Sequence, residues 1–478
     1  MSARPTLGAS LEEAAASLRA GEITSEDLTA ATVDGLEGLG RRLNALVSCH
    51  RDEALKAASL CDEARDAGGN LPPLHGIPLA HKDLYLRAGW AVAAGSRLLE
   101  GVAAEETAEV CRRLDKAGAL DCGRLNTVEF GLGTTGHNEI TGPVHNPWNP
   151  DFITGGSSSG SAAAVAAGLV PAALGSDTGG SVRLPAAACG LVGLKPTFGL
   201  VGRSGVLPLA HSLDTVGPLT RSVRDCALML QAIAGPDAED PACQERPVPD
   251  YLAAIEEGAA GLRIGVPRSY MDGAVDDDVS SAFQTAESAR ASLKLAARDV
   301  TVEGIEMSNR VTTLLIAVEG SAVHSRWLET RAWDYGSQTL SRLMSGLFVP
   351  AEAYVRALEY RQRFLRQTLE GVFREVDVLL TPMWPFRLPT IAESDLGDNP
   401  DFSAMVMASG HFSRPFNLLG LPAITLPCGR CSRGLPIGFQ LVARPFEEAL
   451  LLRTARAFEK ALDLPDDRPG LSVWRQAA

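Results

Sequence analysis

Apolar positions along the chain follow two spacings, and each spacing predicts one kind of element. Apolar residues at helical spacing predict helices over residues 10–37, 51–67, 107–118, 223–234 and 447–462, and a mainly helical stretch over 306–374. Short apolar runs between turn residues predict strands over residues 76–80, 169–174, 262–267, 376–381, 421–427 and 435–442, the last two as a pair. Strands that alternate with helices indicate an α/β fold.

Local signals refine some of these elements. Ser25 is followed three residues later by Leu28, so any helix cap at this point is imperfect. Residues 276–278 are three aspartates, which either charge the first turn of a following helix or form a solvated acidic turn. No linker or internal repeat divides the chain, so we expect one compact domain over residues 1–478.

Composition and charge exclude some classes of function. The 44 Lys and Arg against 58 Asp and Glu give a net charge of −14, which argues against binding to a nucleic acid. The longest uncharged stretch, residues 152–176, is apolar only over 162–174. A membrane span needs about 20 apolar residues, so none is expected.

Cysteine usage and the N-terminal residues predict a location. Glu12 and Glu13 stand where a secretory signal needs an apolar run. The nine cysteines form no framework pattern and indicate free thiols in a reducing, cytoplasmic environment. Cys428 and Cys431 have CxxC spacing without a second pair for zinc, so we interpret them as incidental and expect no metal.

Three segments combine into a candidate site. Lys82 ends an apolar strand, residues 155–161 read GGSSSGS, and residues 175–183 read GSDTGGSVR. Two consecutive glycines before a serine let backbone N–H groups turn inward together as an anion-binding nest. Ser181 is therefore the candidate nucleophile, with an oxyanion hole formed by the backbone N–H groups of Thr178, Gly179, Gly180 and Ser181. The alternative is that Ser181 only caps a helix.

Other interpretations of these segments are less favourable. No lysine follows either Gly-rich loop at P-loop spacing. The glycines at 131, 133 and 136 match GxGxxG, but three prolines follow in place of a helix, so no dinucleotide cofactor is expected. His81 neighbours Lys82 on a strand and should point to the opposite face. Asp177 and Arg183 flank the second loop and are interpreted as structural bracing, as an ion pair, with a catalytic role as the alternative.

The order of these motifs resembles the amidase signature family. The likeness continues through CGLVGLKP (189–196), SLDTVGP (212–218), NLLGLP (417–422) and LPIGFQ (435–440). The resemblance implies a large mixed β-sheet covered by helices on both faces. It also implies a helical N-terminal segment over residues 1–70, a signature core over 71–235 and a more variable helical region on the substrate side over 300–415.

The same resemblance implies a catalytic triad without a cofactor. In it Ser181 is the nucleophile, Ser157 a bridging serine on a cis peptide, and Lys82 the general base. A lysine accepts a proton only when it is neutral, and its reference pKa of ~10.4 leaves few molecules neutral at physiological pH. Burial in an uncharged pocket would lower that pKa.

The expected activity is hydrolysis of C–N bonds in small amides or carbamates, as a monomer or homodimer. The region 300–415 carries enough aromatic and sulfur side chains to line an apolar pocket, namely Trp327, Trp333, Met383, Trp384 and Phe386. The alternative is that they belong to the core, as an aromatic residue near a strand end more often does. Family members usually carry a methionine two residues before the glutamate that matches Glu129; here Thr127 takes that place, which could change the pocket beside the oxyanion hole.

The alternative activity is that of the glutamine-hydrolysing A subunit of the tRNA-dependent amidotransferase. That subunit usually carries an aspartate, which recognises the glutamine amino group, seven residues before the asparagine that matches Asn417. Here that position is Gly410. A binding protein without catalytic activity is a third class, but it would be expected to lose Lys82 or Ser181.

Overall fold

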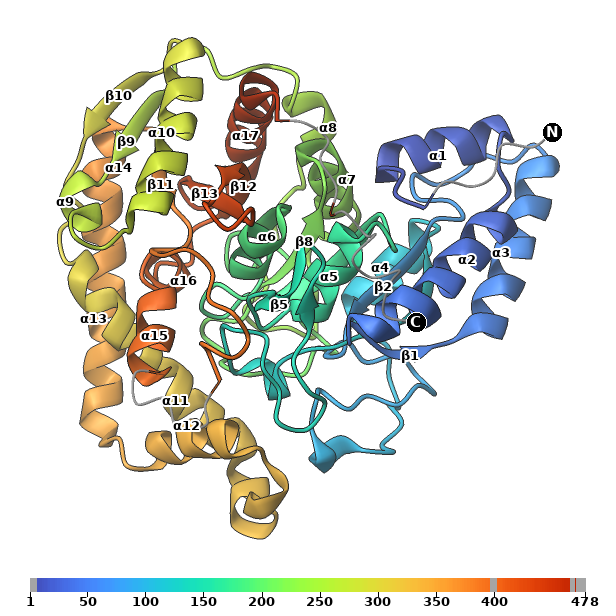
Figure 1. Cartoon of the computed structure of the whole chain (residues 1–478), viewed down its shortest axis with the longest axis horizontal. Coiled ribbons are helices and arrows are strands. Elements are labelled where there is room, and N and C mark those ends of the chain that lie inside the picture. The colour runs from blue at the N-terminus through green and yellow to red at the C-terminus, as the bar shows by residue number, and fades with distance from the viewer. Residues whose placement is uncertain (1–6, 396–401, 465–468, 470–478) are drawn as a thin grey trace.

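A computed structural model shows an α/β molecule built on one large sheet and two smaller ones (Figure 1). It describes residues 7–395, 402–464 and 469. The large sheet has eight strands in the order β10-β9-β11-β13-β12-β7-β8-β6. Their bounds are β6 (Ala172–Ser176), β7 (Val192–Lys195), β8 (Val216–Thr220), β9 (Arg263–Val266), β10 (Ala296–Asp299), β11 (Val378–Pro382), β12 (Ala423–Arg430) and β13 (Pro436–Val442).

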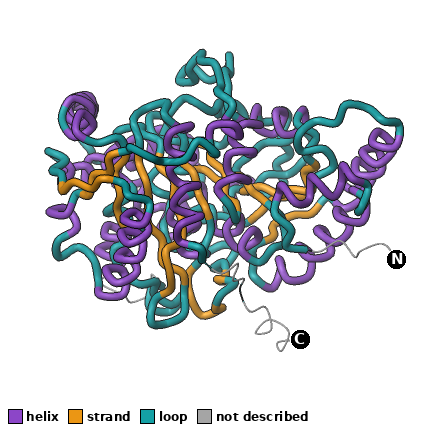
Figure 2. The backbone as a smooth tube through the Cα atoms, turned by 90° about the horizontal axis from the view of Figure 1, so that it is seen from above, coloured by secondary structure: helices purple, strands orange, loops and turns teal. Residues whose placement is uncertain are grey.

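The large sheet is mixed in direction. Strand β9 pairs in parallel with β10 and β11, whereas the other neighbours pair antiparallel. The expected pair near the C-terminus is present as β12 and β13. Figure 2 shows the strands lying between helices, so the predicted mixed sheet covered by helices is confirmed.

A second, three-stranded sheet brings the N-terminal third of the chain to the large sheet. Its order is β1 (Leu46–Cys49), β3 (Leu120–Leu125) and β2 (Pro78–Lys82). Strand β2, at one edge of this sheet, packs beside β6, at one edge of the large sheet. Their carboxyl ends carry Lys82 and Ser176, respectively. The hairpin β4 (His145–Asn146) and β5 (Asn149–Ile153) completes the strands of the described residues.

Helices cover these sheets and connect their strands. In the first half of the chain they are α1 (Leu11–Ala20), α2 (Ser25–Gly35), α3 (Arg51–Asp66), α4 (Glu109–Lys116), α5 (Ser159–Ala166), α6 (Arg183–Cys189) and α7 (Val223–Ile233). The second half has α8 (Tyr251–Ala254), α9 (Arg268–Met271), α10 (Asp277–Ser292), α11 (Ile305–Thr330), α12 (Ser337–Leu347), α13 (Ala351–Glu370), α14 (Val372–Glu375), α15 (Phe402–Ser409), α16 (Arg414–Leu418) and α17 (Glu448–Leu462).

The single helix expected over residues 10–37 is wrong. Gly21 ends α1 with a φ of 67°, a left-handed conformation that glycine adopts without steric cost. Ser10 caps the start of α1 in a reciprocal box with Glu13, and Thr24, rather than Ser25, caps α2. The chain therefore forms two helices at this point.

The aspartates at 276–278 charge the start of a helix, which was the first of the two interpretations. The side chain of Asp276 accepts a hydrogen bond of 2.9 Å from the backbone of Val279, and Asp277 and Asp278 lie in the first turn of α10. Negative charge at this end of a helix is stabilised by the helix dipole.

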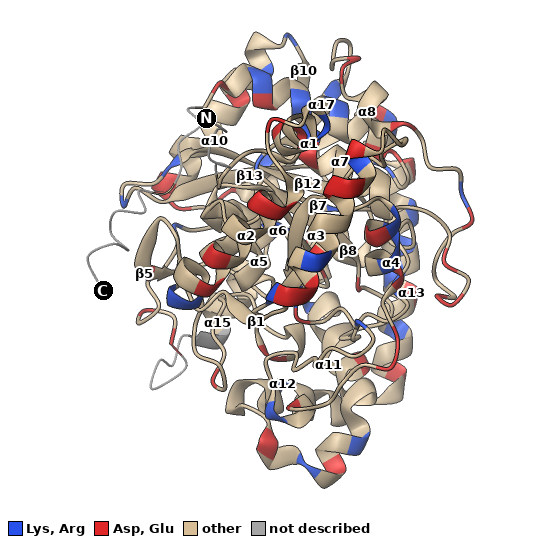
Figure 3. Ribbon diagram, turned by 90° about the vertical axis from the view of Figure 1, so that its right-hand side faces the viewer, with Lys and Arg blue, Asp and Glu red and all other residues tan. Residues whose placement is uncertain are grey.

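The helices carry charges of both signs, and none of those described is apolar enough to span a membrane. Figure 3 shows acidic and basic side chains interspersed over the helices on that side of the molecule. Among the described residues, no helix combines the length and apolar character that crossing a membrane requires.

Candidate active site

Lys82 lies at the end of β2 with its side chain completely buried. Its Nζ donates hydrogen bonds of 2.8 Å to Ser157 Oγ and 2.8 Å to Ser176 Oγ. These hydroxyls come from the loop before α5 and from the end of β6, 75 and 94 residues away in the chain. The packing of β2 against β6 thus places the amine among hydroxyl groups.

The surroundings of Lys82 favour its neutral form. Burial lowers the pKa of Lys82 to about 7, although the negative charges of Asp214 and Asp177 oppose this shift. An amine with a pKa near 7 is neutral in about half of the molecules at that pH. Lys82 is therefore able to accept a proton at physiological pH.

Ser157 belongs to the Gly/Ser-rich loop between β5 and α5. The Gly156–Ser157 peptide bond is cis, as the resemblance implied. Thr127 Oγ1 donates a hydrogen bond of 3.0 Å to the carbonyl oxygen of Ser157. Thr127 thus lies behind the serine and supports its backbone, and it is absent from the lining of the cavity beside Ser181.

Ser181 lies in the loop between β6 and α6. Its side chain does not cap α6, because Val182 occupies the cap position and no side-chain hydrogen bond is made there. Among the described residues no partner is within hydrogen-bond distance of Ser181 Oγ, and 6% of the residue is exposed. The backbone N–H of Ser158 donates to Ser181 O at 3.2 Å, which joins the two Gly/Ser-rich loops.

The backbone of this loop offers three N–H donors instead of the four that were expected. Gly180 N–H already donates to Asp177 Oδ1 at 2.7 Å. The N–H groups of Thr178, Gly179 and Ser181 make no hydrogen bond within the described part of the chain. These three groups remain as candidates for an oxyanion hole.

A buried ion pair fixes the shape of the Ser181 loop. Arg183 Nε lies 3.0 Å from Asp177 Oδ2, and both side chains are fully buried. Arg183 also donates to Asn417 Oδ1 at 2.6 Å and to Gln440 Oε1 at 3.0 Å. The expected ion pair between Asp177 and Arg183 is present, and these contacts favour its interpretation as structural bracing.

A cavity of about 280 Å³ opens beside Ser181. It lies between the Ser181 loop and side chains of α11, α12 and α15. Its apolar lining includes Leu132, Leu209, Ile316, Val406 and Met407, and its polar lining includes Gln338, Arg342 and Arg414. Its size suits the acyl part of a small molecule.

None of the five aromatic and sulfur residues noted in the region 300–415 lines this cavity, so the interpretation that they form its apolar pocket is wrong. Met383 and Trp384 are buried in the core, where Trp384 Nε1 donates to Leu184 O at 3.0 Å. Trp333 is 89% exposed, and Trp327 stacks on Phe130. Phe386 lines a separate surface depression. Packing and exposure, which the residue types do not reveal, decide these positions.

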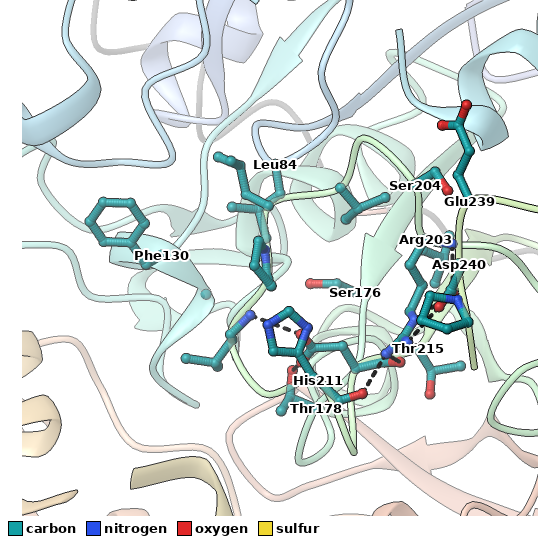
Figure 4. Close-up of a pocket in the computed structure, with 18 residues that line it drawn as sticks. Leu84, Phe130, Ser176, Thr178, Arg203, Ser204, His211, Thr215, Glu239 and Asp240 are labelled. Carbon is teal, nitrogen blue, oxygen red and sulfur yellow. Dashed lines mark hydrogen bonds and ion pairs between the residues drawn. The ribbon is translucent and has the colours of Figure 1, made fainter. Parts of the chain in front are cut away.

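A second cavity, of about 200 Å³, lies on the side of Ser176 (Figure 4). Ser176 and Thr178 lie along one wall, and an ion pair of 2.8 Å between Arg203 and Asp240 lies at another. Both cavities are lined by Thr178, so they meet the Ser181 loop from two sides.

Three other groups noted in the sequence lie outside this constellation. His81 Nδ1 accepts a hydrogen bond of 3.2 Å from the backbone of Leu174, and its side chain turns away from Lys82 as expected. Cys428 and Cys431 are buried free thiols. In the part of the chain that the structure describes, no cluster of three or more His, Cys, Asp or Glu side chains suits a metal ion.

Sequence reasoning missed several residues of the site. Ser176 ends the strand β6 beside Lys82. The strand-end position that identified Lys82 could therefore have identified Ser176 as well. Asp214 accepts a hydrogen bond of 2.6 Å from Thr178 Oγ1 and stands within the SLDTVGP run. Arg342 and Arg414 carry no local pattern, because only the tertiary fold brings their helices to the cavity.

Comparisons with known proteins add to this geometry. A family model described as Amidase matches residues 27–452. The A subunit of glutamyl-tRNA(Gln) amidotransferase from Moorella thermoacetica is 38% identical over 475 residues, which are 95% of this chain and 96% of the relative.

Two solved structures are similar over almost their whole length. One is described as "An unexpected vestigial protein complex reveals the evolutionary origins of an s-triazine catabolic enzyme"; it has a TM-score of 0.89 at 33% identity and covers 95% of this chain and 98% of its own. The other is 6-aminohexanoate cyclic dimer hydrolase, with a TM-score of 0.89 at 29% identity, covering 98% of this chain and 99% of its own.

Proposed function

The chain belongs to the amidase family, and on that premise we propose that it hydrolyses amide C–N bonds through an acyl-enzyme formed at Ser181. The observation that carries the proposal is the hydrogen bond of 2.8 Å between the buried amine of Lys82 and Ser157 Oγ. In this mechanism Lys82, whose pKa is about 7, is the base. Ser157 carries the proton to it from the nucleophile Ser181.

The first half of the reaction forms the acyl-enzyme. Ser181 Oγ attacks the amide carbonyl carbon, its proton passes to Ser157 Oγ, and the Ser157 proton passes to Lys82 Nζ. The negative charge that develops on the carbonyl oxygen is stabilised by the free N–H groups of the Ser181 loop, each typically worth about 3 kcal/mol. The proton then returns through Ser157 to the leaving nitrogen as the C–N bond breaks.

The second half releases the acid. A water molecule attacks the ester carbonyl carbon at Ser181, and its proton passes through Ser157 to Lys82. The proton then returns through Ser157 to Ser181 Oγ as the ester bond breaks. The products are an amine or ammonia and a carboxylic acid. For a carbamate, C–N cleavage leaves an alkoxycarbonyl group on Ser181, and water releases it as a carbonic acid monoester. We propose small amides and carbamates as the substrate range, with the enzyme as a monomer or homodimer.

A second candidate function is supported by the curated relatives. They are A subunits of glutamyl-tRNA(Gln) amidotransferase, which favours a glutamine-hydrolysing subunit over a free-standing amidase. Both functions use the same acyl-enzyme chemistry, so they differ only in the acyl group and in the need for partner subunits. Gly410, which stands where an aspartate would recognise the amino group of glutamine, argues for a different acyl group.

The two functions are separated by assaying the purified chain alone. Ammonia release from glutamine is compared with amine release from alkyl amides, aryl amides and carbamates, each scored by kcat/KM. We expect a small amide to give the highest value, and Ser181→Ala to abolish turnover of every substrate together with labelling by a fluorophosphonate. A highest value for glutamine, or activity that appears only with copurifying subunits, would establish the second function instead.

A further inference from the structure

Two carboxylates act on the buried amine of Lys82, and only one of them is neutralised by a cation. They are Asp177 and Asp214, whose negative charges both favour the ammonium form of Lys82. Asp177 forms an ion pair of 3.0 Å with Arg183. Among the described residues no cation forms an ion pair with Asp214. Asp214 is therefore the uncompensated negative charge near the reacting groups.

The titratable neighbours of Lys82 on its own segment turn to other partners. His81 accepts a hydrogen bond of 3.2 Å from the backbone of β6. The side chain of Asp83 accepts hydrogen bonds of 3.1 and 3.0 Å from the backbone N–H groups of Ala93 and Ala94. The charges that face the amine of Lys82 thus come from other elements of the fold.

Hydrogen bonds hold the carboxylate of Asp214 in place. Thr178 Oγ1 donates to its Oδ1 at 2.6 Å. The backbone N–H groups of Leu209 and Ala210 donate to its Oδ2 at 2.8 and 2.9 Å. Burial raises the pKa of Asp214, whereas these hydrogen bonds and the charge of Arg203 lower it. Because both oxygens accept hydrogen bonds, the contacts favour the ionised form.

The cation nearest to this carboxylate is engaged elsewhere. The guanidinium of Arg203 forms an ion pair of 2.8 Å with Asp240. It also donates to the backbone carbonyl oxygens of His211 at 2.7 Å and Asp214 at 3.3 Å. Arg203 therefore fixes the backbone around Asp214 and leaves the Asp214 carboxylate without a counter-charge.

A short series of contacts connects Asp214 to Lys82. Lys82 Nζ donates to Ser176 Oγ at 2.8 Å, and Ser176, Thr178 and Asp214 line the same cavity of about 200 Å³ (Figure 4). The other hydrogen bond of the amine goes to Ser157, which relays the proton in the proposed reaction. The carboxylate thus acts on Lys82 from the Ser176 side, where it leaves the relay free.

The charge of Lys82 changes during the proposed reaction. The amine is neutral before Ser181 attacks and becomes an ammonium while the tetrahedral intermediate exists. A fixed carboxylate stabilises the ammonium and not the neutral amine, so it acts mainly in the intermediate and in the transition states beside it. It also keeps the pKa of Lys82 from falling below about 7, and a base is most efficient when its pKa lies near the working pH.

We propose that Asp214 is a positioning residue of this reaction, whose carboxylate stabilises the ammonium that forms on Lys82 and, through Thr178, holds the loop that carries the oxyanion-hole donors. The inference rests on the proposed acyl-enzyme at Ser181 and adds a fixed counter-charge for its base. Asp177 differs in this respect, because Arg183 neutralises it.

The pH dependence of Ser181 labelling in Asp214→Asn tests the proposal. This variant removes the charge and keeps the size of the side chain. The second-order rate constant for reaction with a fluorophosphonate is measured from about pH 5 to about pH 9. Loss of a negative charge favours the neutral amine, so the midpoint should fall by about one pH unit from the wild-type value of about 7. The plateau at high pH should fall about tenfold, because the ammonium in the intermediate loses its counter-charge.

A merely structural role predicts a different shift. If the substitution only loosened the loop and admitted water to Lys82, the midpoint would rise toward the ordinary pKa of a lysine, about 10.4. A midpoint that rises or stays at the wild-type value would overturn the proposal. Asp214→Ser removes the same charge with a smaller side chain, so the fall is expected in it as well. Circular dichroism checks that each variant is folded.

The matched control is Glu239→Gln. Glu239 lines the same cavity but is exposed to solvent, which screens its charge. The other titratable groups that line this cavity are His211, which is exposed, and Asp240, which is in an ion pair. We expect Glu239→Gln to keep the wild-type midpoint and plateau. A fall equal to that of Asp214→Asn would show that net charge, rather than the place of Asp214, sets the profile, and would overturn the proposal.

The same measurement separates failure of this inference from failure of the proposed function. A wild type that is labelled with a rising pH profile, together with an Asp214→Asn variant of unchanged profile, would overturn the role of Asp214 and leave the acyl-enzyme intact. A wild type in which Ser181 is not labelled at all would overturn the proposed function, and the role of Asp214 with it.

Discussion

Two buried lysines show why a lowered pKa is not sufficient to make a base. Burial lowers the pKa of both Lys82 and Lys195 to about 7. Lys195 Nζ donates to the carbonyl oxygen of the next residue, Pro196, at 2.8 Å, and no hydroxyl accepts from it within the described chain. Lys82 instead contacts two hydroxyl groups. Only Lys82 therefore has a route for proton transfer.

The two hydroxyl partners of Lys82 are expected to differ in importance. Ser157→Ala removes the group that relays the proton and should lower kcat by about 10²–10⁴, the range of general acid–base catalysis. Ser176→Ala removes one hydrogen bond to Lys82 and leaves the relay in place, so we expect a loss of about tenfold or less. Steady-state kinetics of the two variants measures the difference. Equal losses would contradict a relay through Ser157.

At the level of elements, the site depends on how the β6–α6 loop is fixed. Asp177 accepts from Gly180 N–H at 2.7 Å and Val182 N–H at 3.2 Å, and it pairs with Arg183 from the following helix. One carboxylate thus organises the turn that presents Ser181. The backbone N–H groups of Thr178, Gly179 and Ser181 donate no hydrogen bond to Asp177, so they stay available to the carbonyl oxygen of a substrate.

Replacing this carboxylate tests its structural role. Asp177→Asn leaves the guanidinium of Arg183 buried without its counter-charge, which should cost about 3–5 kcal/mol of unfolding free energy. Chemical denaturation monitored by circular dichroism measures this loss. Glu375→Gln breaks the exposed pair with Arg298 and, as a control, should cost less than about 1 kcal/mol. A loss for Asp177→Asn as small as that of the control would refute the bracing role.

Elements with strong local patterns were predicted well from the sequence. The strand run 435–442 and the final helix over 447–462 agree closely with β13 and α17. The break between α1 and α2 was missed, because Gly21 lies inside a continuous apolar pattern and its left-handed conformation is not visible in that pattern. The short strand β10 was missed because all of its residues are exposed and give no apolar signal.

At the scale of the whole molecule, the site exists only where two sheets meet. Lys82 comes from an edge strand of the small sheet, and Ser176 from an edge strand of the large one. Motif order in the sequence predicted that Lys82 and Ser157 belong together. The cavity beside Ser181 was beyond prediction, because its arginines come from helices that only the complete fold assembles there.

The central claim is that a neutral Lys82 activates Ser181 through Ser157, and the pH dependence of Ser181 labelling tests it most directly. The second-order rate constant for reaction with a fluorophosphonate is measured from about pH 5 to about pH 9, a range that brackets the expected midpoint. Because the neutral amine is the active form, the rate should rise with pH, with a midpoint near the Lys82 pKa of about 7, and then level off. Lys82→Met should lower the rate and abolish this rise. A Lys82→Met variant that keeps both the rate and the rise would contradict the account.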